Sequence, residues 1–134
     1  MGRVLALDHG SVRIGVAVSD AAGIAAHPRG HIDATGPVIE EVRRLIAELD
    51  IERIVVGLPV SLDGSEGPSA AAARAFAAEI ADATAVPTEL VDERFTTAIA
   101  ERALIETGRR RERRRELRDG AAAAVLLQDW LERR

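Results

Sequence analysis

The first third of the chain contains three short segments that read as strands, at 3–8, 13–20 and 24–32, of which 13–20 is rich in β-branched residues. The spacers between them are short, which predicts three consecutive antiparallel strands. Pro28 and Gly30 fall within the third segment. Because proline cannot donate a hydrogen bond to a neighbouring strand, this segment is expected to be an edge strand or to contain a bulge.

After residue 36 the chain alternates between helical periodicity and apolar runs. Apolar residues recur at helical spacing along 37–50, whereas 51–60 is a continuous apolar run typical of a buried strand. The expected helices are 37–50, 70–83, 96–108 and 116–134, and the later strands are 51–60 and 87–93. Three antiparallel strands followed by βα units give the order βββαβαβα. This order predicts an α/β protein with a mixed five-stranded sheet, flanked by helices and built with right-handed crossovers.

Length and composition limit the class of protein. A chain of 134 residues can form one core but not two, so we expect a single domain over 1–134. The absence of cysteine excludes disulfides and thiolate metal sites. No apolar run reaches the length of a membrane span, and the N-terminus leads directly into a strand without a signal-peptide pattern. We therefore expect a soluble cytoplasmic protein that does not contact membranes.

The charge is distributed unevenly along the chain. Residues 109–118 contain seven Arg and two Glu, a local charge of +5, so with a net charge of −4 the remainder carries −9. A basic segment beside an acidic body suggests a partner of negative charge. All 18 basic residues are Arg and none is Lys, which leaves a coding bias as the alternative explanation of this segment.

Two acids lie side by side in the segment VDERFTT, where the strand 87–93 ends and a helix is expected to begin. Ligands of parallel α/β sheets bind beyond the carboxyl ends of the strands, and Asp8 ends the first strand in the same way. If the last strand lies beside the first, Asp92 and Glu93 approach Asp8.

A third acid, Asp119, precedes Ala122 and Ala123 by three and four residues. These small residues share its helical face and let the final helix pack close to the sheet. Three converging carboxylates repel one another, and burial raises their pKa, so they make a poor structural core. Mg²⁺ or Mn²⁺ prefers oxygen ligands, and two such ions about 4 Å apart can activate water and stabilise the leaving oxygen in phosphodiester hydrolysis.

Four segments carry a resemblance to a known family. They are LALDHGSVRIGVAVSD, IVVGLPVSLDGSEG, LVDERFTTAIAE and DGAAAAVLLQDWL. In this order they resemble the YqgF (RuvX) family of pre-ribosomal-RNA nucleases and Holliday-junction-resolvase-like proteins, and the resemblance extends over almost the whole chain. It implies a ribonuclease H-like fold and a two-metal nuclease that acts at the 5′ end of immature 16S ribosomal RNA, with junction cleavage as the other activity.

The resemblance also implies which residues are catalytic and bind Mg²⁺ or Mn²⁺: Asp8, Glu93 and Asp119. The choice of Glu93 over its neighbour Asp92 rests on the resemblance alone. The chain departs from the family pattern near the last motif, where arginines replace Lys, and after Asp119, where Gly120 and Ala121 replace a bulky residue. Glycine inside a helix costs about 1 kcal/mol, which leaves the orientation of Asp119 open.

The nucleic acid partner, RNA or branched DNA, is expected to be bound through phosphates. One Trp, two Phe and no Tyr are too few for base stacking on aromatics to dominate binding. The arginines expected to contact the substrate backbone are Arg109, Arg110, Arg111, Arg113, Arg114, Arg115, Arg13 and Arg94. The glycine-rich loop 61–69 is a candidate for a flexible rim of the same surface, with a turn at Asp63-Gly64.

Other interpretations remain open at this point. A junction resolvase needs two active sites and therefore a homodimer, whereas the RNA nuclease can be a monomer. A nucleic-acid-binding factor without catalysis is the alternative from another class. A sugar-kinase-like nucleotide site at 61–69 is disfavoured, because the loop lacks the GxxxxGK[ST] pattern. His9 is expected to point away from Asp8, toward solvent.

Overall fold

The structure is a computed structural model that describes residues 2–92 and 111–134, with side chains over 2–92 and 120–134. Its strands are β1 (Arg3–His9), β2 (Arg13–Ser19), β3 (Ala26–Asp33), β4 (Ile51–Leu58) and β5 (Thr88–Asp92). Its helices are α1 (Val38–Leu49), α2 (Pro68–Thr84) and α4 (Arg111–Arg133). The predicted mixed five-stranded sheet flanked by helices is confirmed over this part of the chain.

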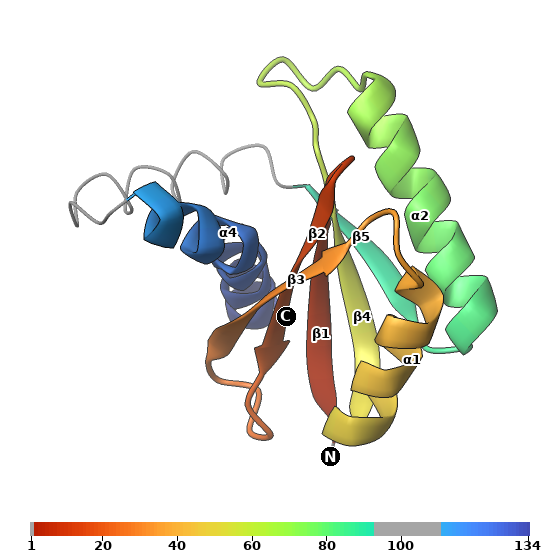
Figure 1. Cartoon of the computed structure of the whole chain (residues 1–134), viewed down its shortest axis with the longest axis vertical. Helices are drawn as coiled ribbons and strands as arrows, with labels where there is room; N and C mark the ends of the chain where they lie inside the picture. Colours follow the sequence, from red (N-terminus) through yellow and green to blue (C-terminus); the bar gives the residue numbers. More distant parts are fainter. Residues whose placement is uncertain (1, 93–110) are drawn as a thin grey trace.

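The strands lie in the order β3-β2-β1-β4-β5. The pairs β1–β2 and β2–β3 are antiparallel, whereas β1–β4 and β4–β5 are parallel. The last strand does not lie beside the first, so the condition under which Asp92 and Glu93 would directly approach Asp8 is not met. The crossover through α1 places β4 next to β1, and the crossover through α2 then places β5 on the outer side of β4 (Figure 1).

The expected edge strand and bulge are both present in β3. The register shifts between Gly15 and Ala17 of β2, where Gly15 faces His31 and Ala17 faces Pro28. Gly30 lies in this bulge with φ of +73°, a conformation that favours glycine over other residues. The bulge therefore absorbs one extra residue at the outer edge of the sheet.

The two faces of the sheet are covered by different helices (Figure 1). On one face α1 and α2 cover a core of large side chains, which includes Leu7, Ile14 and Phe76. On the other face α4 packs on smaller residues, which include Ala6 and Ala17. Successive strand residues alternate between these two cores, as the pleat requires. None of the described helices is long and apolar enough to cross a membrane.

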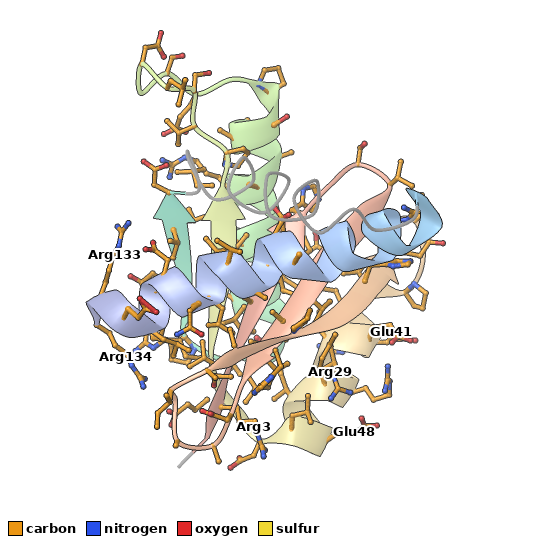
Figure 2. All side chains as sticks on the ribbon, turned by 90° about the vertical axis from the view of Figure 1, so that its left-hand side faces the viewer. Arg3, Arg29, Glu41, Glu48, Arg133 and Arg134 are labelled. Carbon is orange, nitrogen blue, oxygen red and sulfur yellow. The ribbon has the colours of Figure 1, made fainter. Side chains whose placement is uncertain are left out.

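Helix α4 lies across the sheet and is fixed at both edges (Figure 2). The Gln128 side-chain oxygen accepts a 2.9 Å hydrogen bond from the Ala26 N–H, and its amide donates to the Ile24 carbonyl at 3.0 Å. At the opposite edge the Trp130 indole N–H donates to Glu89 at 2.9 Å. These contacts set the direction of α4 over the strands.

Helix α4 begins earlier than predicted, at Arg111 instead of residue 116. Gly120 lies inside it and is buried. A Cβ at this position would lie 2.7 Å from the Pro28 Cβ and 3.3 Å from the Gly30 N. Glycine is thus needed where the helix crosses the bulged edge strand. Its low helix propensity is offset by the close packing that it allows.

We expect Gly120→Ala to lower the thermal midpoint, although alanine is the better helix former. The added methyl group forces α4 away from β3, and overpacking of this kind costs about 1–3 kcal/mol. Thermal denaturation followed by circular dichroism measures the effect. Gly67→Ala is the matched control, because no atom lies within 4 Å of a Cβ there. A Gly120→Ala protein as stable as wild type would contradict the close approach.

Candidate active site

Asp8 lies near the carboxyl end of β1, the central strand of the sheet. Val4 and Ala6 of the same strand belong to the core under α4, so alternation places Asp8 on the α4 face. The residue is half-buried and takes part in an interaction within the protein. Asp8 therefore lies at the rim of the sheet, partly shielded from solvent.

Glycines flank Asp8 on both neighbouring strands. Gly15 of β2 pairs with Asp8, and Gly57 of β4 lies one residue beyond the pair Leu7–Val56. Cross-strand partners point to the same face, so neither neighbour places a side chain beside the carboxylate. This arrangement leaves the surface next to Asp8 to groups that arrive from other elements.

The row through Asp8 continues to both edges of the sheet. Gly15 pairs with His31 of β3, and Gly57 pairs with Val91 of β5. Two strand spacings, roughly 10 Å, separate β1 from β5, so a group at the end of β5 reaches Asp8 only across Gly57. A larger residue at position 57 would stand in that path.

The two neighbouring acids of the VDERFTT segment are separated by the alternation of β5. Val91 packs in the core under α4, whereas Leu90 packs on the opposite face against α2. Asp92 follows Leu90 by two residues and therefore points to the face opposite Asp8. Glu93, the predicted ligand, lies outside the described residues, as does Arg94.

Asp119 lies within α4, one turn before the buried residues Ala122 and Ala123. The predicted small-residue face is confirmed, because these alanines are 2% and 0% exposed. The side chain of Asp119 is outside the part described. Among the side chains that are described, no three of His, Asp and Glu gather to form a metal site.

The predicted nucleic-acid-binding arginines fall in different parts of the chain. Arg13 begins β2 on the same face as Gly15, and its positive charge contributes to lowering the pKa of Asp33, after the hydrogen bonds from Thr35. Arg111, Arg113, Arg114 and Arg115 lie in the first turns of α4, not in a loop, and their side chains are not described. Arg109 and Arg110 lie outside the described residues.

His9 points away from Asp8 as predicted, but the expectation that it faces solvent is wrong. Its ring packs against Phe76 of α2, with the ring centroids 4.7 Å apart and the planes tilted by 33°. Burial lowers the pKa of the His9 imidazole, and the negative charge of Asp8 opposes part of that change. The feature of the sequence that could have indicated this contact is the single phenylalanine, Phe76, in an alanine-rich helix.

The loop between β4 and α2 projects beyond the carboxyl end of β4 (Figure 1). The predicted turn is confirmed: Gly64 has φ of +89°, and the Asp63 carboxylate accepts the Ser65 N–H at 2.9 Å. The loop was expected to be a flexible rim, but its contacts indicate that it is held in place. Val60 and Glu66 form an antiparallel bridge, and Arg74 binds Glu66 through two hydrogen bonds of 2.8 Å.

A family model described as "RuvX: Holliday junction resolvase" matches residues 2–133. The chain belongs to the RuvX family. The resemblance found in its four sequence segments is thereby confirmed.

Curated relatives in this family share much of the sequence. A Mycobacteroides abscessus protein named "Putative pre-16S rRNA nuclease" is 44% identical over 137 residues, which span 99% of this chain and 82% of the relative. A protein of the same name from Pelotomaculum thermopropionicum is 44% identical over 133 residues, spanning 97% and 86%.

Solved structures support the fold. T. thermophilus RuvC in complex with Holliday junction substrate matches with a TM-score of 0.59 at 17% identity, covering 99% of this chain and 96% of that one. A second structure of Thermus thermophilus RuvC matches with a TM-score of 0.55 at 16% identity, covering 98% and 95%. The predicted ribonuclease H-like fold of this RuvX protein is confirmed.

Proposed function

We propose that this RuvX protein is a divalent-metal-dependent nuclease that hydrolyses phosphodiester bonds in the 5′-end processing of pre-16S ribosomal RNA. The names of its curated relatives support the substrate. The observation that carries the chemistry is the position of Asp8 at the carboxyl end of β1, between two glycines of the neighbouring strands.

The donor set fits a hard cation. Asp8 offers carboxylate oxygens at a half-buried position, and Glu93 and Asp119 would complete the ligands for Mg²⁺ or Mn²⁺. A bound pair of such ions supplies an activated water and stabilises the charge on the leaving oxygen. The role of the three carboxylates is to hold and orient these ions, so none of them needs to act as nucleophile.

The packing of α4 supports a role for the third acid. Ala123 packs in the same core as Ala6, which is two residues before Asp8 on the same strand face. Asp119 precedes Ala123 by one helical turn. The direction of α4 and the direction of β1 therefore support a meeting of Asp119 with Asp8 at the rim of the sheet.

The body of the protein is acidic, so a nucleic acid needs positive charge close to the site. Arg13 lies on the Asp8 face, and the arginines of 109–118 directly precede Asp119 in the chain. We place the substrate backbone along these groups. The binding they provide is sequence-independent, since it is directed at phosphates.

The family description favours a second candidate, cleavage of Holliday junctions. One chain carries one Asp8, and a junction requires two symmetric cuts, so this activity needs a homodimer. A sizing column run with and without a four-way junction distinguishes the two candidates. The RNA nuclease elutes as a monomer in both cases, whereas the resolvase elutes as a dimer on the junction.

Asp8→Asn should reduce cleavage of labelled precursor RNA in Mn²⁺ by at least about a hundredfold, because loss of a ligand charge removes transition-state stabilisation supplied through the metal. The thermal midpoint should stay level or rise, since carboxylate repulsion is relieved. Asp82→Asn, an exposed site on α2, is the charge-matched control. Full activity in Asp8→Asn, or wild-type activity in chelator, would falsify the metal-nuclease proposal.

The pair Glu93→Gln and Asp92→Asn tests the assignment within the segment. Asp92 points to the face opposite Asp8, so its replacement should leave metal-dependent cleavage within about threefold of wild type and mainly affect stability. Glu93→Gln should abolish cleavage. The measurement is single-turnover cleavage with thermal denaturation of the same samples. If Asp92→Asn abolished cleavage and Glu93→Gln did not, the description of the fold would still hold, but the site would use Asp92 instead of Glu93.

Replacing Arg110, Arg113 and Arg114 with Gln should weaken nucleic acid binding for every sequence alike. Each phosphate contact contributes about 0.7 to the slope of log affinity against log salt for single strands and about 0.9 for duplex DNA, so the slope should flatten by roughly 1–3 units. Fluorescence titration over a salt series measures it. The control replaces Arg43 and Arg44 of α1, on the other face of the sheet. Unchanged affinity and slope in the test protein would mean that the arginine run reflects coding bias.

A further inference from the structure

A cavity of about 450 Å³ lies on the face of the sheet opposite Asp8, between the first turn of α1 and the middle of α2. Its volume is in the range typical of small-molecule sites, about 300–1,000 Å³. Ile14, Val38 and Ile39 give it apolar walls. The cavity extends to the carboxyl end of β1, because His9 is one of its lining residues.

One wall of the cavity is aromatic. His9 and Phe76 both line it, and their rings form a tilted pair with centroids 4.7 Å apart. Flat rings of this kind can cover the face of a further ring through offset or tilted stacking. Since aromatic residues are otherwise scarce in this chain, this wall is a distinct feature of its surface.

Two carboxylates stand at the cavity without a partner in the described part of the chain. Glu40 and Glu79 line it, and neither receives a hydrogen bond or ion pair from the residues that the structure describes. Other acids nearby are paired: Glu41 and Glu48 both bind Arg44 (Figure 2 labels the two acids). The cavity therefore presents acceptors that the fold itself does not use.

The first turn of α1 adds donors. Pro37 occupies the N-cap position, and no side chain caps the helix. The Val38 N–H donates to the Gly36 carbonyl at 2.9 Å. The N–H groups of Ile39 and Glu40, which also belong to the first turn, have no partner within the helix, and both residues line the cavity. Carboxylate acceptors and backbone N–H donors thus lie beside an apolar, partly aromatic space.

We propose that this cavity binds an unpaired nucleobase of the substrate strand, specifically a base that carries an amino group. The apolar walls would enclose the ring, the aromatic pair would stack on it, and Glu40 or Glu79 would accept hydrogen bonds from its N–H groups. Guanine fits best, because its ring N–H and amino group suit a carboxylate while its carbonyl suits the N–H groups of α1. This inference rests on the proposed nuclease function.

The charge of the cavity decides between a base and a phosphate. Two carboxylates without a nearby cation repel phosphate, so the backbone of the strand would stay on the Asp8 side, where the proposed metal ions and arginines would offset the negative charge. Asp8 and His9 are adjacent in β1 and point to opposite faces. A single-stranded substrate that crosses the end of β1 can therefore place a phosphodiester near Asp8 and an adjacent base beside His9.

Binding of free nucleosides tests the cavity without metal or cleavage. In metal-free protein, guanosine at millimolar concentration should shift the His9 imidazole and Phe76 ring NMR signals, uridine should bind most weakly, and ribose 5-phosphate should cause no shift. Glu79→Gln should weaken guanosine binding about tenfold, as expected for loss of a hydrogen bond to a charged acceptor. Asp82→Asn, one turn further along α2, should bind like wild type.

Failure of this proposal is distinguishable from failure of the nuclease function. If no nucleoside shifts these signals, or if Glu40→Gln and Glu79→Gln both bind guanosine like wild type, the cavity proposal is overturned even when cleavage is normal. In cleavage assays, an abasic nucleotide at one position beside the scissile phosphate should raise KM about tenfold in wild type and have little effect in Glu79→Gln. If the abasic nucleotide changed the KM of wild type and of Glu79→Gln equally at every position tested, the cavity proposal would also be overturned.

Discussion

The close packing of α4 against the sheet is the constraint on which the rest of the structure depends. It requires alanines on the helix face, small residues on the strands beneath, and a glycine where the helix crosses Pro28. Protein interiors tolerate little change in volume, so each of these positions restricts the others. Asp119 directly precedes Gly120 in this helix, so the proposed chemistry would depend on the same packing.

The pleat of the strands divides the chemistry between two faces. Asp8 belongs to the α4 face, whereas its neighbour His9 belongs to the face covered by α2. The first is flanked by Gly15 and Gly57 and leaves room for incoming ligands, while the second stands in a wall of apolar and aromatic groups. The step from Asp8 to His9 along β1 thus leads from an environment suited to cations and phosphates to one suited to a flat ring.

Electrostatics explains why the proposed site would need basic residues close to it. Carboxylates gathered at one end of a sheet repel one another and repel a polyanion, so cations and nearby arginines must offset both effects. Elsewhere the acids are paired locally, as in the contacts of Arg44 with Glu41 and of Arg74 with Glu66. These local pairs neutralise only part of the acidic body, which outside residues 109–118 carries a net charge of −9.

The sequence by itself determined the order of the elements, the mixed sheet, the edge character of β3 and the small-residue face of α4, because each follows from local periodicity or from the backbone limits of proline and glycine. Its motifs also identified the family. Only the tertiary structure decided that β4 separates β1 from β5, that His9 packs on Phe76, and that Gly120 is needed against Pro28. These are contacts between residues far apart in the chain. Periodicity reports which face of an element is buried, but not which distant residue will lie against it.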